Sequence, residues 1–265
     1  MKFTLDTQTE IRTTAHEMAD AGRPIALKYF RTDKQSIENK LDAGFDPVTI
    51  ADKQVELAFR DVLSKRRPMD GILGEEFPAK DSQSGLTWVL DPIDGTRGFI
   101  SGTPTWGMLI ALHDGECPVF GIIDQPYTGE RFIGGFGQAV LQRGDNVRDI
   151  SVRACSTLAQ ATLFSTMPDI GNVSETAAFN RVSDACKLTR FGMDCYAYAL
   201  LAAGQIDLVI EADLNPYDIQ APIALVKAAG GIVTNWQGGS ADQGGQVIAA
   251  GDPVVHAAAM ALLNA

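Results

Sequence analysis

Residues 88–96 read Trp88-Val-Leu-Asp-Pro-Ile-Asp-Gly-Thr96, and this stretch dominates the interpretation of the chain. Its first three residues form an apolar run that is typical of a buried strand ending on Asp91. Pro92 fixes its own φ angle and lacks an N–H group, so a tight turn here lets the carboxylates of Asp91 and Asp94 face one point. Two such carboxylates repel each other unless a hard cation lies between them. The stretch therefore predicts a cation site at the end of a strand.

The residues after Asp94 suit an anion beside that cation. Gly95 lets a ligand approach the backbone closely, and Thr96 and its neighbours offer N–H groups at an expected helix start. A plain surface turn is the commoner use of Asp-Pro and Asp-Gly dipeptides. However, the apolar residues 88–90 and 98–100 on either side disfavour a free surface loop. The pattern thus favours a combined cation and phosphate site.

Two further acidic segments stand out in the sequence. Glu75 and Glu76 follow Gly74, and Asp218 ends the run Asn215-Pro-Tyr-Asp218. Taken alone, the glutamates are typical of a solvated pair, and Asp218 is typical of a helix N-cap. None of the histidines, His16, His113 and His256, lies in an acidic motif, which disfavours a zinc site or a Ser-His-Asp triad.

Composition and charge limit the class of protein. The chain has 265 residues, 45% of them hydrophobic and 21% charged, as expected for a globular protein with a sizeable core. The net charge of −11 and the absence of a dense Lys/Arg run argue against nucleic acid as a partner. An anionic substrate is still compatible with this acidity if metal ions supply local positive charge.

Cysteine usage and the start of the chain bear on location. The four cysteines form no CxxC pair, and residues 1–10 are polar without an apolar export segment. No apolar run approaches the length of a membrane span, so we expect no membrane partner. We therefore expect a cytoplasmic protein with reduced thiols.

Hydrophobic periodicity predicts a layered α/β fold in two halves, 1–145 and 146–265, with the metal cluster where they meet. The first half is expected to hold helices at 7–30 and 49–65, the first kinked or split at Pro24, and then strands at 88–90, 106–112, 119–123 and 131–133. In the second half, strands are expected at 161–165, 188–191, 206–210, 231–235 and 247–250, and helices at 174–187, 194–204, 218–229 and 253–263.

Together, the motifs resemble the inositol monophosphatase family. The segments that carry the resemblance occur in family order and span most of the chain: Val48–Asp52, Gly74–Glu76, Trp88–Thr96, Asn215–Asp218 and Ala228–Gly231. Tyr217 stands where the family commonly has Trp. The resemblance implies the inositol-monophosphatase/fructose-bisphosphatase-like fold, an α+β sandwich of alternating helix and sheet layers. It also implies a homodimer that hydrolyses a small-molecule phosphate monoester with Mg²⁺.

The resemblance also implies a role for each matching residue. One Mg²⁺ would be held by Glu75, Asp91 and the Ile93 carbonyl, and a second by Asp91, Asp94 and Asp218. Such an ion pair lowers the pKa of a bound water and stabilises the attacking and leaving oxygens. Phosphate would lie on Gly95 and Thr96, with Thr49 and Asp52 beside the attacking water and Glu76 supporting the ligands. The implied catalytic residues are thus Thr49, Asp52, Glu75 and Thr96.

Three segments, 44–49, 91–112 and 190–198, resemble the histidinol-phosphate phosphatase branch of the family, which acts in histidine biosynthesis. In that branch the substrate carries an ammonium group, and a carboxylate at Asp194 would suit it. A helix N-cap is an equally good interpretation of Asp194, and Glu211 is a second polar candidate on the substrate side.

Other functions remain open from the sequence. Within the enzyme class, the alternatives are inositol monophosphatase, fructose-bisphosphatase or another sugar-phosphate phosphatase. Outside it, the alternative is a non-catalytic relative that uses the fold for binding or regulation. The intact acidic set favours an enzyme, because clustered carboxylates destabilise a fold that gains nothing from metal.

Overall fold

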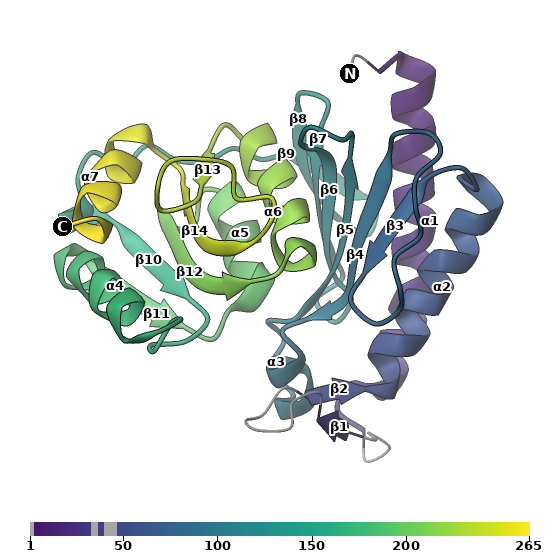
Figure 1. The fold of residues 1–265 in the computed structure, drawn as a ribbon, viewed down its shortest axis with the longest axis horizontal. Coiled ribbons are helices and arrows are strands. Elements are labelled where there is room, and N and C mark those ends of the chain that lie inside the picture. Colours follow the sequence, from purple (N-terminus) through teal and green to yellow (C-terminus); the bar gives the residue numbers. More distant parts are fainter. Residues whose placement is uncertain (1–2, 33–36, 40–46) are drawn as a thin grey trace.

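The computed structural model describes residues 3–32, 37–39 and 47–265, and for 37–39 and 47–49 the backbone alone. Five layers alternate between helices and sheets (Figure 1): a helix pair, a seven-stranded sheet, a second helix pair, a five-stranded sheet and a third helix pair. Three apolar clusters fill the spaces between these layers. The predicted layered α/β fold is therefore confirmed.

The first layer consists of α1 (Leu5–Tyr29) and α2 (Ile50–Arg66), close to the predicted bounds. Both helices bury an apolar stripe against one face of the seven-stranded sheet. Thr4 begins α1, since its side chain accepts a hydrogen bond from the Thr7 N–H at 3.2 Å. Pro24 lies inside this continuous helix, so the predicted alternative of two separate helices is wrong. The buried stripe on both sides of Pro24 holds the two parts in one helix.

The seven-stranded sheet has its strands in chain order, parallel between the first two and antiparallel elsewhere. Its strands are β3 (Gly71–Gly74), β4 (Thr87–Asp94), β5 (Gly107–His113), β6 (Pro118–Gln125), β7 (Glu130–Gly135), β8 (Gln138–Arg143) and β9 (Asn146–Asp149). Periodicity did not predict β3, β8 or β9, because β3 is short and bounded by glycines, β8 has three consecutive apolar residues without alternation, and β9 is exposed along its whole length.

The middle layer consists of α5 (Asp194–Ala202) and α6 (Pro216–Ala228). Helix α6 packs closely on β6 and β7, and two glycines make this approach possible. A Cβ on Gly121 would lie 2.5 Å from the Ala221 oxygen, and one on Gly134 would lie 2.3 Å from the Leu225 Cα. Helix α6 is buried along most of its length, which explains its nearly continuous apolar sequence.

The five-stranded sheet has the order β11-β10-β12-β14-β13, with parallel pairing around β10 and antiparallel pairing around β14. Its strands are β10 (Thr162–Ser165), β11 (Leu188–Phe191), β12 (Leu208–Leu214), β13 (Ile232–Thr234) and β14 (Gly245–Ala250). The outer helices are α4 (Val173–Ala185) and α7 (Pro253–Leu263). The remaining elements are β1 (Ile37–Asn39), β2 (Pro47–Thr49), α3 (Thr96–Ser101) and a 3₁₀ turn (Leu158–Gln160).

In two places, an element of the predicted half 146–265 pairs with or packs on strands of the predicted half 1–145. Strand β9 extends the first sheet to Asp149, and α6 from the later half packs on the strands of the earlier half. The division into two domains therefore stays a prediction. Among the described helices, none combines the length and apolar character that a membrane crossing requires.

Candidate active site

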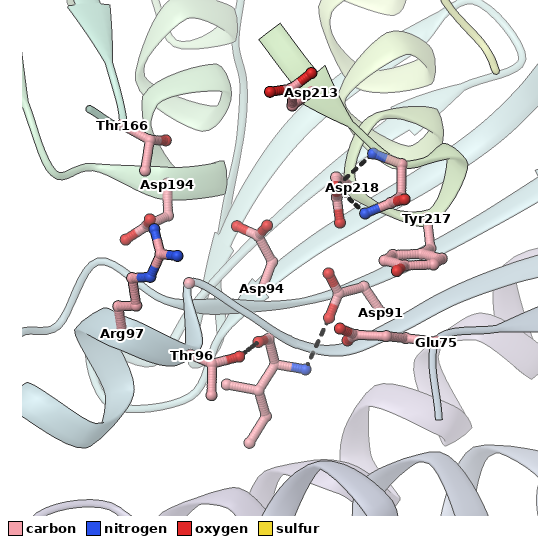
Figure 2. A pocket seen from close by; sticks show the side chains of 13 residues that line it. Glu75, Asp91, Asp94, Thr96, Arg97, Thr166, Asp194, Asp213, Tyr217 and Asp218 are labelled. Atoms are coloured by element: carbon pink, nitrogen blue, oxygen red, sulfur yellow. Dashed lines mark hydrogen bonds between the residues drawn. The ribbon is translucent and has the colours of Figure 1, made fainter. Parts of the chain in front are cut away.

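A cavity of about 630 Å³ lies where the two sheets and α6 approach one another (Figure 2). Residues from both halves of the chain line it, from the ends of β3, β4, β10 and β12 and the starts of α3, α5 and α6. The lining residues are Glu75, Asp91, Ile93, Asp94, Gly95, Thr96, Arg97, Thr166, Asp194, Asp213, Asn215, Tyr217 and Asp218.

Asp91, Asp94 and Asp218 come together on the floor of this cavity, with carboxylate oxygens within 4.8 Å of one another. A register shift in β4 between Asp91 and Asp94 turns both towards the same space. Asp218 is held in the first turn of α6, where Asn215 is the N-cap, so the interpretation of Asp218 as the N-cap is wrong. Its Oδ2 accepts a hydrogen bond from the Asn215 N–H at 2.7 Å.

The charges of this cluster repel one another. Burial, and then the charges of Glu75, Asp94 and Asp218, raise the pKa of Asp91 well above its usual range. Burial also raises the pKa of Asp94, together with the charge of Asp194, although the Cys195 N–H donates to Asp94 Oδ2 at 2.6 Å. A hard divalent cation prefers oxygen ligands, and it would neutralise carboxylates that repel one another in this way. The residues therefore fit Mg²⁺.

A second acidic group lies beside the first. Oxygens of Asp52, Glu75 and Glu76 lie within 4.8 Å of one another, and of these residues only Glu75 also lines the cavity. Asp52 is buried in the first turn of α2. The buried Glu56 holds the Glu75–Glu76 segment in place, since its Oε2 accepts a hydrogen bond from the Glu76 N–H at 2.7 Å.

Glu56 was not predicted as a site residue, although the sequence shows Arg60 four residues after it. Arg60 lies one turn later on α2 and donates to Glu56 Oε1 at 2.8 Å. Glu-to-Arg spacing of four residues on a helix is a recognisable signal for such a pair. Thr49 ends β2 directly before α2, and its side chain lies outside the described residues.

The expected helix start at Thr96 is confirmed, since α3 begins there. Gly95 precedes it with φ 81°, a left-handed conformation that favours glycine. A Cβ on Gly95 would also lie 2.8 Å from the Asp194 side chain. The Thr96 hydroxyl donates to the Ile93 carbonyl oxygen at 3.1 Å, which ties the turn to the end of β4.

Asp194 lies at the opposite side of the cavity from Glu75 (Figure 2). Met193 is the N-cap of α5 and Asp194 the first helical residue, so the N-cap interpretation of Asp194 is wrong. Thr105 Oγ1 donates to Asp194 Oδ2 at 3.2 Å. Burial raises the pKa of Asp194 to about 6, while the Thr105 hydrogen bond and the charge of Arg97 act to lower it.

Glu211 lies behind the cavity wall rather than in it. Its Oε1 accepts hydrogen bonds from the Thr166 N–H at 2.7 Å and the Thr166 hydroxyl at 2.9 Å. Burial raises the pKa of Glu211 to about 8. In this structure Thr166 stands between Glu211 and the cavity space, so Glu211 positions Thr166.

Five lining residues were not predicted as site residues: Arg97, Thr166, Asp213, Asn215 and Tyr217. Arg97 directly follows the motif Trp88–Thr96, and Asn215 and Tyr217 lie within the motif Asn215–Asp218, so both motifs offered an available signal. Thr166 directly follows β10 and Asp213 lies near the end of β12, two strands that pair in parallel. The carboxyl ends of parallel strands are common ligand sites, but only the sheet order reveals them.

A model of the inositol monophosphatase family matches residues 7–265. The chain belongs to the inositol monophosphatase family. The family resemblance of its motifs is thereby confirmed. One similar family member is the bifunctional phosphatase IMPL2, chloroplastic, of Arabidopsis thaliana, 41% identical over 93% of this chain and 73% of the relative.

Two further relatives differ in their named substrates. The histidinol-phosphatase of Mycobacterium tuberculosis is 33% identical over 94% of this chain and 95% of its own. The structure of an inositol monophosphatase from Zymomonas mobilis superposes with a TM-score of 0.85 at 38% identity, covering 97% of this chain and 98% of its own. The comparisons thus agree on the family and the fold and leave the substrate open.

Proposed function

We propose that this chain is a Mg²⁺-dependent hydrolase of phosphate monoesters and that its substrate is L-histidinol phosphate. The observation that carries the proposal is the set of carboxylates of Asp91, Asp94 and Asp218, with oxygens within 4.8 Å on the floor of a cavity. A surface used only for binding gains nothing from carboxylates that raise one another's pKa. The arrangement therefore supports catalysis over a non-catalytic role.

The ligands we propose for one Mg²⁺ are Glu75, Asp91 and the Ile93 carbonyl, and for a second ion Asp91, Asp94 and Asp218. When bound there, Mg²⁺ supplies positive charge to the phosphate oxygens and acidifies a water molecule. The raised pKa values of Asp91 and Asp94 support this set, because a nearby cation favours their ionised forms.

The chain's own residues orient the phosphate and accept the proton. Gly95 and Thr96 present backbone N–H groups at the start of α3, and we propose that these bind the phosphate oxygens. Asp52, grouped with Glu75, is the proposed acceptor of a proton from the attacking water. Thr49 is the second residue that we propose to lie beside this water. The leaving oxygen then points to the side of the cavity that holds Asp194.

Asp194 is the residue we propose for substrate choice. L-Histidinol phosphate carries an ammonium group close to the phosphate ester, and the half-buried Asp194 carboxylate, held by Thr105, offers it a charge-assisted hydrogen bond. The named activity of the Mycobacterium tuberculosis relative supports this choice. Inositol phosphate is the second candidate, supported by the similarity to the Zymomonas mobilis inositol monophosphatase.

A substrate panel tests the proposal. Phosphate release is measured from L-histidinol phosphate, inositol 1-phosphate, fructose 1,6-bisphosphate and p-nitrophenyl phosphate, with Mg²⁺ and with EDTA. We expect kcat/KM to be highest for L-histidinol phosphate and all release to require Mg²⁺. Preference for inositol phosphate would overturn the substrate choice alone, and release of no phosphate at all would overturn the enzyme assignment.

We also propose that the protein is a cytoplasmic homodimer, as the family resemblance implies. Sedimentation at micromolar concentration is expected to give the mass of a dimer, and a monomer mass would contradict the proposal. Localisation of the full chain in its cells tests the compartment, which the chloroplastic relative leaves open.

A further inference from the structure

The side of the cavity away from the metal-ligand cluster carries a pair of opposite charges. Asp194 and Arg97 both line it, and Figure 2 shows the Arg97 guanidinium turned towards the Asp194 carboxylate. The electrostatic influence of Arg97 on Asp194 agrees with this view. Among the described residues that line the cavity, Arg97 is the only Lys, Arg or His.

The two partners of this pair differ in their exposure to solvent. Asp194 has a left-handed backbone with φ 46°, accepts a hydrogen bond from Thr105, and lies where Gly95 leaves room for it. Arg97 lies in the first turn of α3 and is exposed to solvent. The carboxylate is therefore a fixed point, and the guanidinium lies beside it on the exposed side of the cavity.

A fixed carboxylate beside an exposed guanidinium complements a particular substrate group. The carboxylate accepts from an ammonium, and the guanidinium donates two parallel hydrogen bonds to a carboxylate. An α-amino acid carries both groups on one carbon. In O-phospho-L-serine, that carbon is joined to the phosphate ester oxygen through one CH₂ group.

L-Histidinol phosphate has the same core. Its ammonium-bearing carbon is also joined to the ester oxygen through one CH₂ group, but it carries an imidazolylmethyl group where phosphoserine carries a carboxylate. Both substrates can thus place phosphate at Thr96 and ammonium at Asp194. The third substituent then meets Arg97, which stacks on aromatic rings as well as pairing with carboxylates.

We propose that Arg97 binds this third substituent and that the enzyme has a second activity, the hydrolysis of O-phospho-L-serine. The inference rests on the proposed phosphatase function of the same site. Water supplies the oxygen of the new P–O bond, the bond from phosphorus to the serine ester oxygen breaks, and one proton of the water ends on the serine hydroxyl. No further reactant is needed.

O-Phosphoethanolamine is the matched substrate for a test, because it has the ammonium and the phosphate ester but no carboxylate. The ratio of kcat/KM for O-phospho-L-serine to that for O-phosphoethanolamine is measured with Mg²⁺. We expect a ratio of at least about ten for the wild-type protein, a tenfold gain being typical of one charge-assisted pair. In Arg97→Gln, the ratio is expected to fall to about one, whatever happens to the absolute rates.

The control variant is Arg148→Gln, which removes the same charge from the exposed strand β9 and is expected to keep the wild-type ratio. A wild-type ratio near one, or a ratio that survives Arg97→Gln, would overturn the inference. L-Histidinol phosphate is assayed alongside. If L-histidinol phosphate is hydrolysed but the ratio of O-phospho-L-serine to O-phosphoethanolamine is near one, only the role of Arg97 is overturned. If none of the phosphate esters is hydrolysed, the proposed function is overturned as well.

Discussion

Asp124 and the pair Asp91 and Asp94 all lie on the seven-stranded sheet, and the surroundings of their carboxylates differ. Asp124 on β6 is fully buried, and two arginines bind it: Arg23 donates at 2.7 and 2.8 Å and Arg131 at 2.5 Å. Asp91 and Asp94 on β4 accept from backbone N–H groups of Ile93 and Cys195 and face other carboxylates.

The difference separates a structural charge from a functional one. A buried carboxylate with arginine partners is neutralised within the chain and needs no ligand. Carboxylates whose nearest charges are negative have raised pKa values and weaken the folded state until a cation neutralises them. We infer that Asp124 holds α1 to the sheet, whereas Asp91 and Asp94 form a metal-binding site.

The largest expected effect comes from Asp94→Asn. The change removes an anionic ligand, and we expect kcat to fall by about a thousandfold or more, since electrostatic stabilisation of the transition state is lost. Phosphate release at saturating Mg²⁺ measures it. The control Asp149→Asn, on the exposed strand β9, is expected to leave kcat unchanged. Activity near the wild-type level in Asp94→Asn would remove this residue from the metal site.

Asp124→Asn probes the other side of the comparison. It leaves the charges of Arg23 and the nearly buried Arg131 without their shared partner, so the free energy of unfolding should fall by about 3 kcal/mol. Urea unfolding in EDTA measures this loss, and the same loss should appear with Mg²⁺ present. A variant as stable as the wild-type protein would show that the Asp124 network is not structural.

Asp194 sharpens the comparison, because this half-buried carboxylate has the positive charge of Arg97 nearby. We expect Asp194→Asn to lower kcat/KM for L-histidinol phosphate by roughly ten- to a hundredfold, as one desolvated charge-assisted hydrogen bond is lost. Hydrolysis of p-nitrophenyl phosphate, which has no ammonium group, should fall far less. Equal losses for both substrates would mean that Asp194 has a structural role.

The same residue predicts a pH effect. Because the pKa of Asp194 is raised to about 6, its carboxylate is mostly ionised at pH 7 and mostly neutral at pH 5. The ratio of kcat/KM for L-histidinol phosphate to that for p-nitrophenyl phosphate should therefore fall by up to about tenfold between pH 7 and pH 5. In Asp194→Asn the ratio should lose most of this dependence. A ratio with the same pH dependence in both proteins would assign the titration to another group.

Local patterns predicted most of the fold. Helix α6 was expected at 218–229 and spans Pro216–Ala228, since an apolar run with Pro near its start and Gly230-Gly231 after its end marks both boundaries. Strands β8 and β9 were missed, because the apolar residues of β8 stand in one short run without alternation and β9 is exposed; β8 is ordered by pairing with β7, and β9 by pairing with β8. Such pairing is a tertiary effect that a local pattern does not contain.

The site residues also divide into those that a local sequence pattern predicts and those that only the tertiary structure brings together. Asp91 and Asp94 lie three residues apart, so a turn was enough to predict that they meet. Asp218 was linked to them through the family resemblance. Thr166 and Asp213 carry no motif, and only the parallel pairing of β10 with β12 brings them to the cavity. The metal-ligand cluster was therefore predictable from the sequence, whereas most of the opposite wall required the structure.

The most direct test of the central claim is the thermal stability of the wild-type protein and Asp94→Asn, each measured in EDTA and during titration with Mg²⁺. The account predicts that Mg²⁺ raises the Tm of the wild-type protein, with about 2.7 kcal/mol of stabilisation at a hundred times the Kd. Asp94→Asn should be at least as stable as the wild-type protein in EDTA and should respond far less to Mg²⁺. The claim that these carboxylates form a metal-binding site would be contradicted by a wild-type Tm that does not change with Mg²⁺. It would also be contradicted by an Asp94→Asn variant that is less stable than the wild-type protein in EDTA.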